Sequence, residues 1–413
     1  MKKHKSFIFF AVTILALMWA APAAMADDIV FGYTGPLSGP GAEYGEDCAN
    51  GLEMAIDEIN QQGGVTVKGK KYTFRLEKMD DKVSPELAVA NAGRLRKDHK
   101  AVAVFNPVAT TIAPLMKINQ EKKNEFIIMG YTSVPTMSMM GNKLLVTTAT
   151  PFTMYIKVYV SLAWDKGWRK GAMVVAQGAY GEAWRKLFAD AWTKKGGVIT
   201  ADKPANYYTR TDYAGPLAEA LATDPDFILI GGPSATTALI IEQARARGFE
   251  GGFLMIDQAK LDAVRVVMEK PLGMEGCIGV GMVDSTGYPA TETFTREYVA
   301  RYKRAPTWES VLHYTHGHAL AQAIEAAGSV DNPAAIRAAF PKIFPMLGDK
   351  YPMELWGITP TGLLIYYPLV QTMKHGRFTQ ATGYIWWLKT QQEFEGLKRA
   401  SKGSTYLVWF PQQ

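Results

Sequence analysis

The chain has few cysteines and no strong excess of either charge. Its 413 residues include two cysteines, Cys48 and Cys277, which excludes a small scaffold built on disulfides. The two could bridge, but we expect two separate buried thiols. Half of the formal net charge of +6 comes from Lys2, Lys3 and Lys5, so the remainder of the chain is nearly balanced. This mild balance argues against a nucleic-acid partner.

Long apolar runs and common catalytic motifs are also lacking. No stretch after residue 26 reaches the roughly eighteen apolar residues that a membrane-spanning helix needs. The glycine-rich GCIGVG has the wrong spacing for a dinucleotide fingerprint, and neither a Walker loop nor G-x-S-x-G occurs. These absences weigh against the enzyme classes that such motifs mark, although an exported enzyme stays open as a third class of function.

Residues 1–26 have the three parts of a secretory signal peptide. A basic start is followed by the apolar FIFFAVTILALMWA and by APAAMA, a small-residue cleavage pattern. We expect cleavage between Ala26 and Asp27 and export to the periplasm, with a retained anchor helix as the alternative. Residues 27–413 are then too many for one ordinary core and suit two lobes.

The rest of the sequence alternates strand and helix patterns. Strands such as AVAVF, FIIMG and DFILIGG are apolar throughout, and amphipathic helices separate them, which indicates an α/β protein with parallel sheets covered on both faces. Ser84 and Pro85 read as a helix N-cap followed by proline. Three stretches where strands run into proline, glycine or small polar residues, 147–152, 283–289 and 356–362, are candidate crossings between lobes that act as hinges. From Gly383 onward we expect a strand and an edge extension.

Polar and aromatic side chains follow the strands of the first half, where ligands bind in doubly wound sheets. Tyr44 lies in the glycine-rich GYTGPLSGPGAEYGED, Thr110 and Thr111 follow FNPVA, and Tyr131 and Ser133 lie in MGYTSVP. Clustered hydroxyls and free N–H groups suit a desolvated carboxylate. The alternative is that these hydroxyls cap their own helices and that Tyr44 is an ordinary loop residue.

The second half repeats this arrangement. Tyr180 follows a strand in AQGAYGE, and Asp257 follows another in MIDQAK. Asp257 could pair with a ligand ammonium group, and a helix N-cap is its equal alternative.

Three histidines, His313, His316 and His318 in HYTHGH, form the one tempting metal motif. On a helix His318 projects away from the other two, and no carboxylate or cysteine completes the set. We therefore expect a packing helix and no metal.

Several motifs together resemble a known family. GPLSGPGAEYGED, AIDEINQQGGV, the acid pair Asp80–Asp81, AVANAGRLRKD, AYGEAW and DFILIGG occur in order, and the chain resembles the type I periplasmic solute-binding proteins over about residues 28–375. The similarity is greatest to the leucine/isoleucine/valine-binding branch. It implies two Rossmann-like, doubly wound lobes joined by three hinge crossings. Lobe 1 would comprise 27–148 and 286–357, and lobe 2 would comprise 149–285 and 358–413.

The resemblance also implies a binding site. In this branch two lobe 1 loops bind the ligand carboxylate, and the second lobe supplies a tyrosine and an acid for the ammonium group. A tyrosine of the first loop, Tyr44 here, also matches the family. The full set of corresponding positions in this chain is Tyr44, Ala109, Thr110, Thr111, Tyr131, Ser133, Tyr180 and Asp257. Three positions depart from the family pattern: Ala109 lacks a hydroxyl, Tyr131 replaces a small residue, and Pro233 replaces a ring.

The function implied is the periplasmic component of an ABC importer, without catalytic activity. It would capture a small carboxylate-bearing solute by hinge closure and present it to the membrane permease subunits. We expect a branched-chain or aromatic amino acid, with an aromatic or other small carboxylate lacking an amine as the alternative. A ligand sensor for a membrane receptor is a further alternative. We expect a monomer with no cofactor and no nucleic-acid partner.

Overall fold

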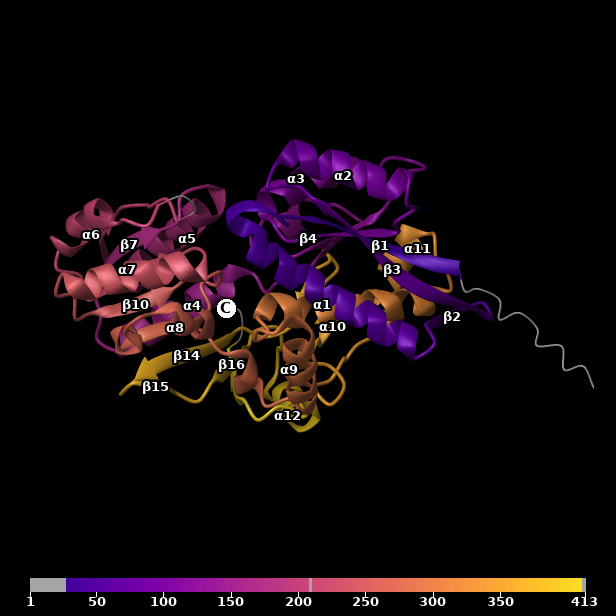
Figure 1. Ribbon diagram of the computed structural model, residues 1–413. Helices are drawn as coiled ribbons and strands as arrows, with labels where there is room; N and C mark the ends of the chain where they lie inside the picture. Colours follow the sequence, from indigo (N-terminus) through magenta and orange to yellow (C-terminus); the bar gives the residue numbers. More distant parts are fainter. Residues whose placement is uncertain (1–26, 208–209, 411–413) are drawn as a thin grey trace, which may run out of the picture.

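The computed structural model describes residues 27–207 and 210–410. The predicted signal peptide, residues 1–26, lies outside the described residues. Figure 1 shows two α/β bodies, one built around β1 and β4 and the other around β7 and β10, with the C-terminal strands running beneath their junction. Every helix of the described part is too short or too polar to cross a membrane.

The first body contains a six-stranded sheet with the order β2-β3-β1-β4-β5-β6. All its neighbouring strands are parallel except the pair β2 and β3. Its strands are β1 (Asp27–Gly35), β2 (Val65–Val67), β3 (Lys70–Asp80), β4 (Ala103–Asn106), β5 (Ile127–Gly130) and β6 (Leu145–Thr147). β4 and β5 are buried along their whole length, because helices cover both faces of the sheet.

The helices of the first body form two separate cores against this sheet. Those on one face are α2 (Pro85–Lys97) and α3 (Ala109–Ile118), and those on the other are α1 (Ala42–Gln61), α9 (Pro289–Tyr302), α10 (Trp308–Ala327) and α11 (Pro333–Ala339). α1 and α10 pack closely, and a Cβ atom at Gly51 would lie 2.0 Å from the Ser310 carbonyl oxygen. α2 begins as predicted, with the Ser84 hydroxyl accepting from Leu87 N at 3.2 Å and Pro85 in the first turn.

The second body contains a nine-stranded sheet with the order β17-β16-β14-β11-β10-β9-β7-β8, and β15 pairs with β14. β7 to β11 are parallel, and β14 joins β11 antiparallel. Its strands are β7 (Lys170–Val175), β8 (Val198–Asp202), β9 (Phe227–Gly231), β10 (Gly252–Met255), β11 (Cys277–Val280), β14 (Leu369–Lys374), β15 (Arg377–Phe378), β16 (Thr382–Ile385) and β17 (Tyr406–Trp409). Its helices are α4 (Phe152–Asp165), α5 (Ala179–Lys195), α6 (Ala214–Leu221), α7 (Ser234–Ala246) and α8 (Leu261–Val267).

The chain passes three times between the two sheets. It leaves β6 for α4 through residues 148–151, and it leaves β11 for α9 through residues 281–288. The third passage lies later than the expected stretch 356–362, because the hairpin of β12 (Gly357–Ile358) and β13 (Leu364–Ile365) still adjoins the first sheet. There Thr147 pairs with Leu363, and its N–H donates to Gly362 O at 2.9 Å. The exact lobe boundaries stay a prediction.

The segment after Gly383 adds an edge to the second sheet. β17 pairs with β16 in parallel, as an edge strand. Between them lies a helix that we did not expect, α12 (Gln391–Ala400). Its signal was present in the sequence: Thr390 and Glu393 form a capping box, in which each side chain accepts from the other's backbone N–H.

Candidate functional site

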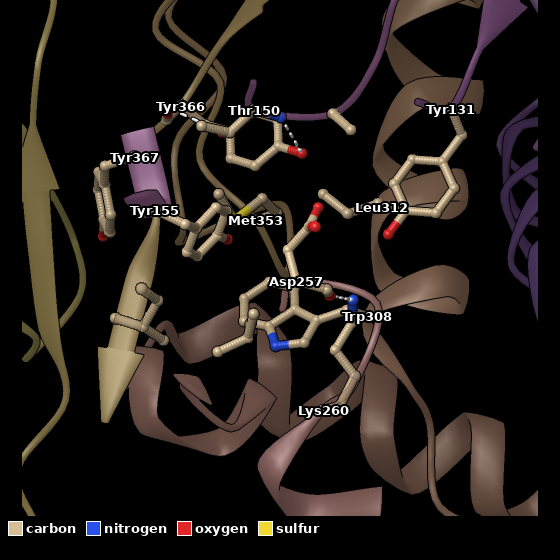
Figure 2. A pocket seen from close by; sticks show the side chains of 13 residues that line it. Tyr131, Thr150, Tyr155, Asp257, Lys260, Trp308, Leu312, Met353, Tyr366 and Tyr367 are labelled. Carbon is tan, nitrogen blue, oxygen red and sulfur yellow. Dashed lines mark hydrogen bonds between the residues drawn. The ribbon is translucent and has the colours of Figure 1, made fainter. Parts of the chain in front are cut away.

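A cavity lies between the two sheets, beyond the carboxyl ends of their strands. It encloses about 410 Å³ not filled by atoms, part of it open to solvent. Its wall draws on both bodies and on the passages between them, and it is formed by Tyr131, Ala149, Thr150, Tyr155, Asp257, Lys260, Val280, Trp308, Leu312, Met353, Tyr366, Tyr367 and Leu369. Figure 2 shows the side chains of Tyr131, Tyr155, Asp257 and Lys260 converging on one space. A lining of apolar and aromatic side chains with a few charged groups is typical of a binding site for a small organic solute.

The Asp257 carboxylate is held in one orientation by two donors from α5. Trp184 Nε1 donates to Asp257 Oδ1 at 2.8 Å, and the Tyr180 hydroxyl donates to the same oxygen. Burial, followed by the Asp257 charge, raises the pKa of Tyr180 well above its usual value, so this hydroxyl keeps its proton. The N-cap of the following helix is Lys260, so the alternative that Asp257 caps that helix is wrong. Asp257 is an oriented acceptor in the cavity wall.

Lys260, in the cavity wall, forms an ion pair with Glu309, which lies beside that wall. Lys260 Nζ lies 3.5 Å from Glu309 Oε1, and their side chains are 10% and 8% exposed. Lys260 follows β10 in the second body, whereas Glu309 lies on α10, which packs against the first. Lys260 Nζ also donates to the Asp257 backbone carbonyl, and the Tyr131 hydroxyl donates to Glu309 Oε1 at 3.3 Å. The pair therefore joins the two bodies at the cavity.

Tyr44 lies behind Tyr131 rather than in the cavity wall. The two rings stack with centroids 6.3 Å apart and planes 21° apart, and the Tyr44 hydroxyl donates to Pro107 O at 3.0 Å. The Tyr131 ring meets the His313 ring edge-on at 5.1 Å. Burial raises the pKa of both tyrosines well above the usual value. The structure thus brings Tyr44 to the site as a support for Tyr131.

Residues 109–111, which form the first turn of α3, are not brought to the cavity wall. The Thr111 hydroxyl is buried within hydrogen-bond distance of Asn106 Oδ1 (2.8 Å) and Val108 O (2.9 Å). Thr110 is exposed, and Ala109 packs on the core beneath α2 and α3. The Thr111 hydroxyl therefore makes its hydrogen bonds within its own segment of chain, as the alternative to ligand binding expects. A ligand role for these three residues stays a prediction.

Ser133 lies where the two bodies meet. It is buried, its backbone carbonyl accepts from Phe152 N at 2.9 Å, and its side chain makes a hydrogen bond to Tyr180 that partly offsets the burial-driven rise in the pKa of Tyr180. Because Tyr180 also bonds Asp257, Ser133 is one bond removed from the oriented carboxylate.

The three histidines of α10 are buried in helix packing. Burial lowers the pKa of His313 and of His318 to about 4 and that of His316 further. Among the described residues, no three His, Cys, Asp or Glu side chains are arranged to hold a metal ion. Cys48 and Cys277 are both buried free thiols in different cores, which confirms the expected pair of separate thiols.

Sequence reasoning missed most of the cavity wall. The missed wall residues include Lys260, Thr150, Tyr155, Trp308, Met353, Tyr366 and Tyr367. Glu309, the partner of Lys260, was missed as well. One available signal was that Thr150 lies within a predicted crossing and that Tyr366 and Tyr367 lie just after another. These two passages touch at the cavity, where Thr150 N donates to the Tyr366 hydroxyl at 3.1 Å.

Comparison with known proteins agrees with this geometry. Residues 28–345 match the model of a family described as periplasmic binding protein. The Leu/Ile/Val/Thr-binding protein of Salmonella typhimurium is 28% identical over 56% of this chain, which spans 62% of that relative's length. The Leu/Ile/Val-binding protein homolog 3 of Brucella melitensis is 24% identical over 86% of this chain and 91% of its own.

Solved structures show the same fold. A branched-chain amino acid transporter substrate-binding protein from Streptococcus pneumoniae, in complex with isoleucine, superposes with a TM-score of 0.72 at 20% identity, over 86% of this chain and 99% of its own. A solute-binding protein of an ABC transporter from R. palustris, in complex with benzoate, has a TM-score of 0.70 at 18% identity, over 85% and 95%. These likenesses confirm the predicted α/β fold of two doubly wound lobes.

Proposed function

This chain belongs to the family of periplasmic binding proteins, and we propose that it captures an amphipathic amino acid, branched or aromatic, for an ABC importer. It would act in the periplasm as a receptor without catalysis and deliver the solute to the membrane permease subunits. The observation that carries the proposal is the cavity itself, whose wall holds Asp257 and Lys260, side chains of opposite charge, with Glu309 paired to Lys260 beside it.

The balance of charge favours a ligand that carries an amine. When ionised, Asp257 and Glu309 outnumber Lys260 by one negative charge. A simple carboxylate would add a second uncompensated negative charge to a largely buried site, whereas a zwitterion adds none. Uncompensated buried charge costs several kcal/mol, so this difference is large compared with ordinary ligand selectivity.

The cavity wall also offers a place for an apolar side chain. Val280, Leu312 and Met353 line it together with four tyrosines and Trp308. Asp257, which Trp184 and Tyr180 orient, would accept from the ligand ammonium group. Tyr131 would close the opposite side, with Tyr44 stacked behind it and Ser133 beside the cavity. The lobes would close on the ligand because it binds the closed arrangement more tightly.

An aromatic carboxylate without an amine is the second candidate. Its support is the ring-rich wall of Tyr131, Tyr155, Trp308, Tyr366 and Tyr367, which suits stacking on a planar ligand. The R. palustris protein of the same fold is in complex with benzoate.

A thermal-shift screen tests the proposal. The exported protein, residues 27–413, would be unfolded and refolded to strip bound ligand, then heated with L-leucine, L-phenylalanine, 3-phenylpropanoate or benzoate. A ligand at a hundred times its Kd adds about 2.7 kcal/mol to the free energy of unfolding. We expect shifts with one or both amino acids. Shifts with only the two amine-free acids would overturn the proposal in favour of the second candidate.

A further inference from the structure

Lys260 stands out among the cavity residues because it is a buried cation. Its ammonium group lies 3.5 Å from Glu309 Oε1. It also donates to the Asp257 backbone carbonyl, a contact that Figure 2 shows at the cavity. An ammonium group carries three N–H donors, and a lysine is retained in a buried site only where anions surround it.

Of the two first-lobe segments expected to bind the ligand carboxylate, residues 109–111 are poorly suited to binding it. Ala109 has no hydroxyl, the Thr111 hydroxyl bonds its own loop, and Thr110 faces solvent. In the second of the two expected loops, Ser133 lies outside the cavity wall and its side chain bonds Tyr180. Lys260 is the cation that lines the cavity, so it is the charged partner that a ligand carboxylate would meet there.

We propose that Lys260 binds the ligand carboxylate and that Glu309 positions Lys260 for it. This inference rests on the proposed function and deepens it. The closed site would then hold an alternating row of charges: Glu309, Lys260, the ligand carboxylate, the ligand ammonium and Asp257. The row is complete only with an α-amino acid, so it selects against ligands that lack either the carboxylate or the amine.

The test compares each amino acid with the two analogues that lack one group. The probes are L-leucine, 4-methylpentanoate and 3-methylbutylamine, and in parallel L-phenylalanine, 3-phenylpropanoate and 2-phenylethylamine. Isothermal titration with stripped protein gives Kd for each. The quantity of interest is the ratio of Kd for the amine to Kd for the amino acid, because this ratio measures recognition of the carboxylate independently of the fraction of protein that is folded.

Three variants separate binding from folding. Lys260→Gln leaves Glu309 as a lone buried charge and could fail to fold, so the double variant Lys260→Gln/Glu309→Gln removes both charges together. Lys260→Arg keeps the charge. Lys186→Gln is the matched control, because Lys186 is exposed on α5 in the same lobe and pairs only at the surface with Asp190.

We expect the wild-type ratio to be at least about a hundredfold and to fall about tenfold or more in both variants that lack Lys260, since a hydrogen bond between charged groups is lost. Lys260→Arg should retain most of the ratio and Lys186→Gln all of it. Glu309→Gln alone should strengthen binding of 4-methylpentanoate, an effect that a merely structural role would not produce.

An unchanged ratio in the double variant would overturn the role of Lys260. The proposed function fails separately, if wild-type protein binds neither amino acid. The wild-type protein could bind 3-phenylpropanoate instead. Loss of that binding in the double variant would then still support Lys260 as the carboxylate partner, and retention of that binding would overturn this role of Lys260.

Discussion

Replacing Asp257 by asparagine isolates the charge that we assign to the ligand ammonium group. Asparagine keeps an Oδ1 acceptor, so the hydrogen bonds from Trp184 (2.8 Å) and Tyr180 can persist. The cavity wall stays the same size, and only the negative charge and one acceptor are lost. We therefore expect the free energy of unfolding to change by less than about 1 kcal/mol, as for replacements that leave buried groups bonded.

The effect on binding should be much larger and should depend on the ligand. A hydrogen bond between charged groups contributes about 1.5–3 kcal/mol, so the Kd for L-leucine or L-phenylalanine should rise about 10- to 150-fold. For 3-phenylpropanoate, which lacks the amine, removing a nearby negative charge should leave the Kd unchanged or lower it.

Isothermal titration of stripped wild-type and Asp257→Asn protein measures both values. Asp190→Asn serves as the control, because Asp190 is an exposed carboxylate on α5 in a surface pair with Lys186. Equal Kd values for the amino acid in Asp257→Asn and wild type would refute the reasoning and leave Asp257 as an anchor for Tyr180 and Trp184 alone.

Three other perturbations follow from the geometry around the site. Tyr44→Ala removes the ring stacked on Tyr131, so ligand binding should weaken by about 1–2 kcal/mol; an unchanged Kd in titration would show that Tyr131 needs no such support. Burial lowers the pKa of His313 to about 4, so as the pH falls this histidine takes up a proton in the unfolded chain before it does so in the folded chain. Stability should then fall as pH drops from 6.5 to 4, and His313→Gln should lessen this fall by about 3 kcal/mol in urea titrations; equal slopes would contradict it. Burial also raises the pKa of Cys277 to about 12 and that of Cys48 well above its usual value, so a thiol reagent at pH 8 should label neither until the protein is denatured.

The sequence predicted the fold well because the fold depends on local patterns. Apolar runs such as those at β4, β5 and β9 are buried along their whole length, which follows directly from helices covering both faces of a parallel sheet. The N-cap at Ser84 is likewise a contact between near neighbours. Where the sequence prediction was incomplete, as at α12, a local signal existed and was not used.

The candidate site was predicted only where its residues follow strands. Tyr131 and Asp257 lie in the cavity wall, and Tyr44, Tyr180 and Ser133 lie beside it. Position after a strand did not say which way a side chain turns, and Thr111 turns into its own loop.

The sequence by itself determined the two sheets, the edge at which we expect a ligand to bind and several residues at that edge, because the spacing of apolar residues along the chain indicates strands and helices. Only the tertiary structure decided that Lys260 meets Glu309, that Trp184 orients Asp257, and that two passages between the lobes line the cavity. These contacts join residues from different lobes or from distant elements. Their partners are set by how whole sheets and helices pack against one another, and no local pattern encodes that packing.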